Sequence, residues 1–381
     1  MAGDSIHSFM LFFLATTLLL SNSVSFTVDR LFSSGPPPSI FVFGDSLSDT
    51  GNAVEAYSFY NQAEKSPYGS TFFHSPSGRF SDGRLIIDFL TSKWGLPFLQ
   101  PYFSNIAPNY RHGINFAVGG ATAQNITDPV VFFLHLQINH FLSFKHKVYS
   151  SLNAKHISRC AVSHVPPVEA FNNGLYVICI GSNDFLRAIL RDNLTPTVVK
   201  QKTVPLVISA ITKAIKDLHK EGAMNFLVFN FPAFGCTPLA LTLGSMGPFN
   251  STDQFGCLQV YNAVVDFANV GLEKSLHVLS NKFSNIHVAL VDFQKFTFDV
   301  AANPEIYGFR RSEKFKACCG YGGGPYNYNP LISCGKNAEA KACSNPREYT
   351  SWDGLHPTDA FNQRFVEELT KGTHYRRSIG G

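Results

Sequence analysis

Residues 39–52 have the sequence SIFVFGDSLSDTGN, and this stretch decides both the fold and the chemistry of the chain. Ile40 to Phe43 form a short apolar run, which is typical of a strand buried on both faces. The run stops at Gly44 and a polar turn follows, so Ser46 lies just beyond the C-terminal end of the predicted strand. Open α/β sheets build their sites at that edge. A serine there can act as a nucleophile if a histidine reaches it and a third group orients the histidine.

Further apolar runs predict the rest of a parallel sheet. They alternate with segments of helical periodicity and cover residues 114–118, 175–180, 225–231 and 286–291. The main predicted helices cover residues 84–90, 130–150, 196–221, 254–281 and 357–370, with Ser81 or Asp82 as the N-cap of the first. Continuous apolar strands separated by helices indicate a parallel sheet covered on both faces. We therefore expect a three-layer α/β/α fold with about five parallel strands.

Composition favours one large secreted domain. The 381 residues are 45% hydrophobic and 15% charged, and no low-complexity linker divides them, so we expect a single domain over residues 39–372. The net charge is only +4, with no basic run that alternates with aromatic residues, so nucleic acid is not an expected partner. Residues 1–25 resemble a signal peptide, since Phe9 to Leu20 are almost continuously apolar and Ser23-Val24-Ser25 suits a signal peptidase. The alternative is an N-terminal membrane anchor, for which the apolar run is short.

Secretion, to the extracellular space or the vacuole, agrees with two further patterns. N-glycosylation sequons begin at Asn125, Asn193 and Asn250. Eight cysteines in an oxidising compartment suggest disulfides, although they allow 105 pairings. We expect Cys236 to pair with Cys257 across a loop. Cys318, Cys319, Cys334 and Cys343 lie in a Gly-rich segment that needs covalent ties, whereas Cys179 fits a free thiol as well as a bridge. After cleavage of the signal peptide no remaining stretch is expected to insert stably into a membrane.

The candidate catalytic residues lie at the ends of predicted elements. Ser46, Gly119 and Asn183 each follow an apolar strand, so all three should meet at one edge of the sheet. Far downstream, Asp353 and His356 lie three residues apart in a turn before a helix. The carboxylate can accept from His356 Nδ1 and leave Nε2 free to take the Ser46 proton. The N–H groups of Ser46 and Gly119 and the Asn183 amide can then form an oxyanion hole.

Each of these features alone has an ordinary structural explanation. Gly-Asp-Ser also occurs at residues 3–5, inside the predicted signal peptide, where it can have no catalytic meaning. Asn183 could cap a helix, Asp353 could be a helix-entry carboxylate, and His356 could be a surface histidine. Their order along the chain, each at the end of a strand or the start of a helix, favours the catalytic interpretation.

Taken together the motifs resemble the GDSL esterase/lipase family of the SGNH-hydrolase superfamily, in its plant secreted form. The matching segments are FGDSLSDTGN at 43–52, NFAVGGA at 115–121, GSND at 181–184 and DGLHP at 353–357, with RFSDGR at 79–84 also typical of plant members. The resemblance implies a flavodoxin-like sheet and hydrolysis of a small-molecule ester through an acyl-enzyme on Ser46. It assigns the base to His356 and requires no metal or organic cofactor. The glycine of the second segment corresponds to Gly119, or to its neighbour Gly120.

Other functions remain open on the sequence. An acyltransferase could use the same triad, and a non-catalytic binding protein could share the fold. A glycosidase would need two facing carboxylates, for which Asp45, Asp49, Asp184 and Asp353 are near the right edge. No lid-like amphipathic helix stands out, which favours small or specialised-metabolite esters over bulk lipid. The oligomeric state is not indicated.

Overall fold

A computed structural model of the chain describes residues 35–59, 61–104, 108–126, 132–154, 162–245 and 250–379. The predicted signal peptide and Cys160 lie outside these residues. Among the described helices none is long and apolar enough to cross a membrane.

The central sheet confirms the five predicted parallel strands. They are β1 (Ile40–Gly44), β2 (Gly113–Asn115), β3 (Leu175–Cys179), β4 (Asn225–Phe229) and β5 (His287–Val291), with a sixth strand, β8 (Tyr375–Ile379), that the sequence did not predict. Their order is β2-β1-β3-β4-β5-β8, and only β8 runs antiparallel to its neighbour. Because β1 lies inside the sheet, its C-terminal end at Gly44 emerges beside the ends of β2 and β3.

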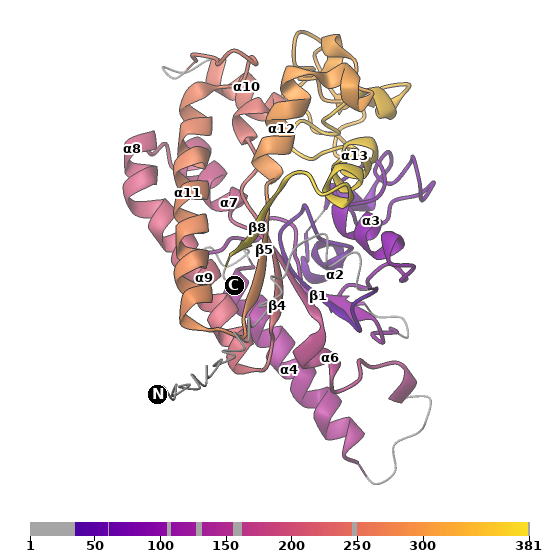
Figure 1. The fold of residues 1–381 in the computed structure, drawn as a ribbon. Coiled ribbons are helices and arrows are strands. Elements are labelled where there is room, and N and C mark those ends of the chain that lie inside the picture. Colours follow the sequence, from indigo (N-terminus) through magenta and orange to yellow (C-terminus); the bar gives the residue numbers. More distant parts are fainter. Residues whose placement is uncertain are drawn as a thin grey trace, which may run out of the picture.

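Helices cover both faces of this sheet and make the three predicted layers (Figure 1). The longer ones are α3 (Ile86–Lys93), α4 (Leu134–Leu152), α9 (Val204–Lys220), α11 (Gln259–Lys282), α12 (Phe293–Ala302) and α13 (Asp359–Thr370). Shorter ones are α2 (Asn52–Ala56), α6 (Ala170–Asn173), α7 (Ser182–Leu186), α8 (Pro196–Val198) and α10 (Pro238–Ser245). Helices α4, α9 and α11 pack against the face that carries Phe41 and Phe43, and α3, α12 and α13 against the face that carries Ile40 and Val42.

Two local features differ from the simplest reading of the sequence. The predicted helix at 196–221 contains a π-helical turn, Val199–Thr203, just before Pro205, which lies in the first turn of α9 and lacks the N–H for a helical bond. The prediction of Ser81 or Asp82 as the N-cap of α3 is wrong. Leu85 takes that position, and its N–H donates to the Asp88 carboxylate at 2.9 Å. Asp82 instead accepts from the N–H of Asp359 at the start of α13, at 2.8 Å.

The segment between α12 and α13 is irregular and is tied by disulfides. It contains a two-stranded ribbon of β6 (Cys319–Gly320) and β7 (Lys341–Ala342). Disulfides join Cys318 to Cys343 and Cys319 to Cys334, and a third joins Cys236 to Cys257, as predicted. Cys179 is a buried free thiol, one of its two expected states. The two disulfides within this segment hold the chain that leads to Asp353 and His356, where β6 and β7 are only two residues long each.

Candidate active site

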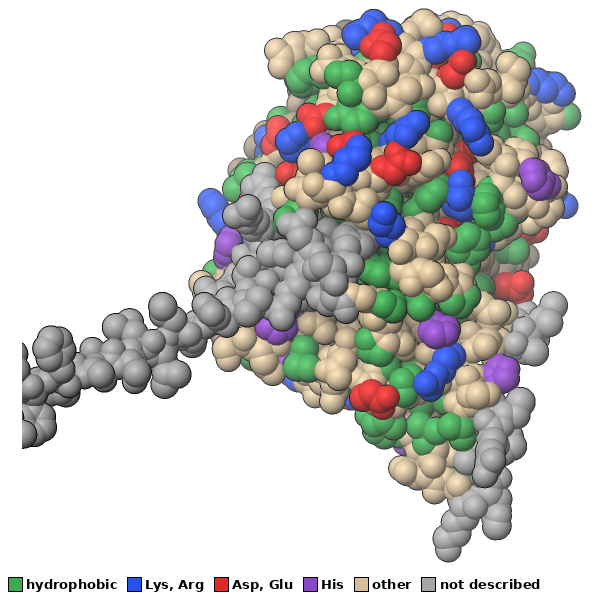
Figure 2. Space-filling model, turned by 45° about the vertical axis from the view of Figure 1, so that its right-hand side comes forward, with side chains coloured by type: hydrophobic (Ala, Val, Ile, Leu, Met, Phe, Trp, Pro, Cys, Tyr) green, Lys and Arg blue, Asp and Glu red, His purple; other side chains and the backbone are tan. Residues whose placement is uncertain are grey.

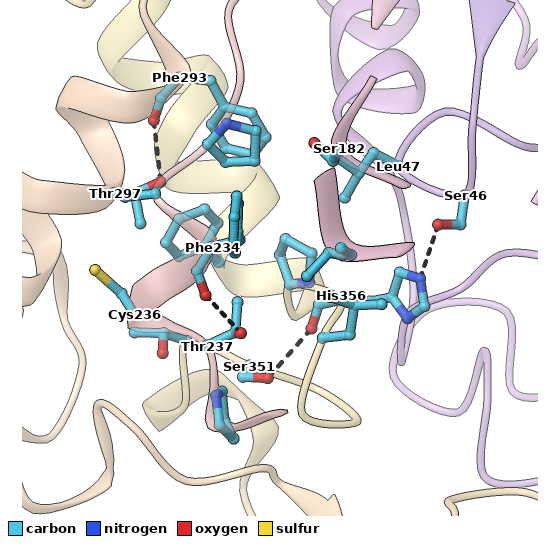
Figure 3. Close-up of a pocket in the computed structure, with 18 of the residues that line it drawn as sticks. Ser46, Leu47, Ser182, Phe234, Cys236, Thr237, Phe293, Thr297, Ser351 and His356 are labelled. Carbon is cyan, nitrogen blue, oxygen red and sulfur yellow. Dashed lines mark hydrogen bonds between the residues drawn. The ribbon is translucent and has the colours of Figure 1, made fainter. Parts of the chain in front are cut away.

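The structure brings Ser46, His356 and Asp353 into one hydrogen-bonded chain at the C-terminal edge of the sheet. Figure 3 shows the bond between Ser46 and His356. Ser46 Oγ lies 2.8 Å from His356 Nε2, and His356 Nδ1 lies 2.6 Å from Asp353 Oδ2. Ser46 and His356 are separated by 310 positions in the sequence, so only the fold can join them. With the Nδ1 proton directed at the carboxylate, Nε2 is left to accept from the serine hydroxyl. This is the arrangement that nucleophilic serine chemistry requires.

Asp353 is surrounded by donors. Its Oδ1 accepts from the N–H groups of Leu355 and His356, and its Oδ2 accepts from the Tyr68 hydroxyl at 2.7 Å as well as from His356. Burial opposes ionisation of Asp353, but the charge of His356 and these hydrogen bonds outweigh it and hold the pKa below its ordinary value. The carboxylate is therefore ionised and can both orient the imidazole and stabilise an imidazolium.

The turn after β1 holds two more buried carboxyls in a different electrostatic state. Burial raises the pKa of Asp45 to about 7. One N–H, from Leu47, donates to its Oδ1 and opposes the rise, but its Oδ2 has no hydrogen-bond partner. Burial also raises the pKa of Asp49, to about 6. The carboxylate accepts hydrogen bonds from four N–H groups, which oppose this rise: those of Gly51, Asn52, Ala53 and Gly119. Asp49 thereby links this turn to the end of β2.

Of the expected oxyanion donors, Asn183 lines the same cleft as Ser46, but the geometry does not support Gly119. Its N–H already donates to Asp49 Oδ2 at 2.7 Å and is not available to a substrate. Gly120 follows it in an exposed turn with a φ of 80°, and no hydrogen bond of its N–H is found within the described residues. Gly120 is therefore the better candidate of the two adjacent glycines. Asn183 Nδ2 donates to Ala121 O at 2.9 Å, which fixes the amide and leaves its second N–H for a ligand.

Asn183 is positioned by the sharp turn between β3 and α7. Gly181 makes that turn with a φ of 119°, and a Cβ added there would lie 2.5 Å from the Phe231 ring. Only glycine suits both the backbone conformation and the close contact. Asp184, the next residue after Asn183, accepts from the N–H groups of Ala123 and Gln124 and so binds the loop after β2 to α7. Burial raises the pKa of Asp184 to about 6.

Two aromatic residues near the triad were not predicted as part of the site. Tyr68 is fully buried, packs edge-on against Trp352 and donates to Asp353; no pattern around it in the sequence indicates this role. Phe80 lies with its ring centroid 5.1 Å from that of His356, and a Cβ added to Gly119 would come within 2.4 Å of it. Phe80 belongs to the RFSDGR segment, which the family resemblance had already singled out.

A cleft of about 750 Å³ opens beside Ser46 and His356. Its walls come from the turn after β1, α7, the loop before α10, α12 and the segment 350–357 (Figure 3). The described residues contain no group of three or more His, Cys, Asp or Glu side chains placed to hold a metal ion. The three sequon asparagines, Asn125, Asn193 and Asn250, are all exposed, as attachment of a glycan requires.

Comparison with known proteins agrees with this geometry. A family described as GDSL-like Lipase/Acylhydrolase matches residues 40–369. The chain belongs to this family. A GDSL esterase/lipase of Arabidopsis thaliana is 37% identical, with 88% of this chain and 87% of the relative covered, and a second from the same plant is 36% identical, with 93% and 91% covered. GDSL esterase/lipase ENOD8 of Medicago truncatula is 33% identical, with 88% and 86% covered. As a member of the GDSL family, the protein is a carboxylic ester hydrolase.

Proposed function

We propose that this GDSL hydrolase is a secreted serine esterase that cleaves small or specialised-metabolite esters through an acyl-enzyme on Ser46. Ser46 Oγ attacks the ester carbonyl carbon while His356 Nε2 takes its proton. The N–H groups of Ser46 and Gly120 and the Asn183 amide stabilise the oxyanion. His356 then protonates the departing alcohol and later deprotonates the water that releases the acid. The observation that carries this proposal is the unbroken hydrogen-bonded chain from Ser46 to Asp353 at the mouth of a cleft.

The hydrogen bonds of the carboxylates near this edge argue against a glycosidase. Asp49 and Asp184 accept backbone N–H groups and are occupied in fixing the turns, and Asp353 is engaged by His356 and Tyr68. Asp45 is the one remaining carboxyl of this set, so no facing pair is left to provide both an acid and a base.

Secretion is proposed from the predicted signal peptide together with the three disulfides and the exposed sequon asparagines. Figure 2 shows one face of the protein, on which Lys and Arg side chains are mixed with Asp and Glu side chains and form no continuous basic surface. That mixture suits a small-molecule substrate better than nucleic acid.

Treatment of the secreted protein with an N-glycosidase should lower its mass, and an unchanged mass would remove the glycans from the proposal.

Hydrolysis of p-nitrophenyl acetate by the secreted protein tests the proposed function. Ser46→Ala should abolish the activity, whereas Ser48→Ala, a matched change two residues away, should retain it. Equal rates in the parent and Ser46→Ala would remove Ser46 from the mechanism. Product analysis with an added acceptor alcohol distinguishes the acyltransferase alternative, since a new ester would form in place of the free acid.

A further inference from the structure

The cleft beside Ser46 extends away from the triad toward α12. In Figure 3, Thr297 and Cys236 lie at the end opposite Ser46, with Phe234 between them and His356. Large apolar side chains form much of the wall: Leu47, Leu186, Phe234, Phe293, Leu355 and Phe361. A group attached to the ester carbon or oxygen can therefore enter this space while the ester itself lies at Ser46.

Four of the hydroxyl groups along the cleft are already used inside the protein. Each donates its proton to a backbone carbonyl: Thr237 to Phe234 at 2.7 Å, Thr297 to Phe293 at 3.0 Å, Thr350 to Lys314 at 2.6 Å and Ser351 to His356 at 3.5 Å. A hydroxyl that has given its proton to a carbonyl can only accept from a ligand. These four side chains therefore offer a ligand no hydrogen-bond donor. Apart from Ser46, the remaining hydroxyl of the described wall is that of Ser182, which lies beside Leu47 and away from the end formed by Thr297 and Cys236 (Figure 3).

The backbone N–H groups of the wall before α10 are also used in hydrogen bonds inside the protein. The N–H groups of Phe234, Gly235, Cys236 and Thr237 all donate to other protein atoms, at 2.8 to 3.0 Å. The disulfide from Cys236 to Cys257 ties this wall to the start of α11. A ligand therefore meets no free N–H group from these four residues either.

Charged groups are confined to the end near Ser46. Among the described residues that line the cleft, His356 and Asp45 are the ionisable ones, and neither Lys nor Arg is present. The donors proposed for the substrate, Asn183 and the backbone at Ser46, lie at the same end. A carboxylate or phosphate placed toward α12 would lose its water without gaining a cation or a donor, which is costly.

We propose that this cleft binds an uncharged, apolar group of the ester substrate and rejects groups that end in a carboxylate or phosphate. The inference rests on the proposed function and extends it to the substrate class. Two half-buried residues on different walls, Leu186 on α7 and Thr297 on α12, are positions at which a charge can be introduced to test this preference. The apolar group can be the acyl chain or the alcohol, because both are attached to the ester that Ser46 attacks.

Matched neutral and anionic esters test the proposal. The first pair is p-nitrophenyl hexanoate and mono-p-nitrophenyl adipate, which have six acyl carbons and differ in a terminal carboxylate. The second pair is hexyl acetate and the acetyl ester of 6-hydroxyhexanoate, which places the same difference on the alcohol. In the pair whose variable group, acyl or alcohol, enters the cleft, kcat/KM of the neutral ester should exceed that of the anionic ester by at least about 10²-fold. Along the same series from acetyl, each added methylene should raise kcat/KM by up to about fourfold.

The outcomes separate this inference from the proposed function. A neutral preference in the acyl pair assigns the cleft to the acyl chain, and a preference in the alcohol pair assigns it to the alcohol. Comparable rates for neutral and anionic esters in both pairs, with hydrolysis that still depends on Ser46, would overturn the inference alone. Absence of Ser46-dependent hydrolysis of every ester, including the acetyl ester, would overturn the proposed function and the inference with it.

A positive charge placed in the cleft should weaken the preference for neutral esters. Thr297→Lys introduces an ammonium at the end toward α12, and the ratio of neutral to anionic kcat/KM should fall at least about tenfold. Thr297→Val, which has nearly the same volume and no charge, is the matched control and should keep the wild-type ratio. Leu186→Lys provides a second site if the first variant folds poorly. Unchanged ratios in both folded lysine variants would contradict the assignment.

Discussion

Two regions meet at the active site, and they hold their buried carboxylates in opposite states. The turn after β1 carries Asp45, whose pKa burial raises to about 7. The loop before α13 carries Asp353, whose pKa lies below its ordinary value although burial opposes ionisation there too. Both carboxyls are buried and both are near His356.

The difference between the two regions comes from hydrogen-bond partners. Asp353 accepts from two backbone N–H groups, from Tyr68 and from His356, whereas Asp45 accepts from Leu47 N–H and leaves Oδ2 without a partner. The charge of His356 and the donors around Asp353, and not the degree of burial, keep that carboxyl charged at neutral pH. Asp353 then orients the base, whereas Asp45 is only partly ionised at neutral pH and adds less negative charge beside the oxyanion.

The strongest test of this comparison is Asp353→Asn. The amide cannot hold the imidazole as a carboxylate does and favours the wrong tautomer, so kcat should fall by about 10³–10⁴-fold. Asp45→Asn, measured at pH 6, should cost far less, because the wild-type residue is already mostly neutral there. Similar losses in both variants would show that the two carboxyls do not differ in charge.

Removal of an oxyanion donor should have the next largest effect. Asn183→Ala deletes the side-chain amide, and kcat should fall by about 10²–10³-fold with little change in KM, since the hydrogen bond forms in the transition state. Steady-state kinetics with p-nitrophenyl acetate provide the measurement. A rise in KM with an unchanged kcat would mean that Asn183 binds the ground state equally well.

Tyr68→Phe sharpens the account of the Asp353 region. The variant keeps the ring against Trp352 but removes the hydroxyl that donates to Asp353 Oδ2. With two N–H donors and His356 still in place, kcat should fall only about tenfold, the equivalent of one ordinary hydrogen bond to a charged group. A loss as large as that of Asp353→Asn would make Tyr68 an essential part of the base assembly.

In the Asp45 region the smallest effect on rate is expected, and the change appears in stability instead. Because the folded pKa of Asp45 is about 7 against an ordinary 3.8, its contribution to stability is present below about pH 4 and is lost as pH rises to 7. The Asp45→Asn variant has no ionisable group at this position, so it does not lose stability in this way as the pH rises. Its free energy of unfolding, relative to wild type, should therefore rise between pH 4 and 7 by about 4 kcal/mol and level off above.

Urea unfolding at several pH values, with the disulfides intact, measures this difference. Asp49 and Asp184 are present in both proteins, so their own raised pKa values cancel in the comparison. A stability difference that is independent of pH would contradict a neutral Asp45.

Sequence patterns predicted the strands that build the site and missed the contacts that arise only on folding. Most of the parallel strands consist largely of apolar residues, for example Ile40 to Phe43, because both of their faces are buried. Residues 375–379, an antiparallel edge strand, have a polar and basic sequence that lacks this signal. Edge strands need less apolar surface, which is why periodicity did not reveal β8.

The same distinction applies to the candidate site. Ser46, Asn183, Asp353 and His356 could be named in advance because each follows a strand or precedes a helix. Tyr68 could not, because it reaches Asp353 across 285 positions without a local motif.

The choice between Gly119 and Gly120 also depended on coordinates. Both glycines fit the pattern, and only the bond from Gly119 N–H to Asp49 decides between them.

Labelling with a serine-directed fluorophosphonate, mapped by mass spectrometry, tests the central claim most directly. The serine oxygen displaces fluoride from the probe and forms a stable phosphonate ester, which imitates the covalent attachment of the acyl group to the enzyme. We predict one adduct per chain, on Ser46, that is absent in Ser46→Ala and forms far more slowly in Asp353→Asn. An active enzyme that carries the adduct on another residue, or that hydrolyses esters without labelling, would contradict the assignment of Ser46 as the nucleophile.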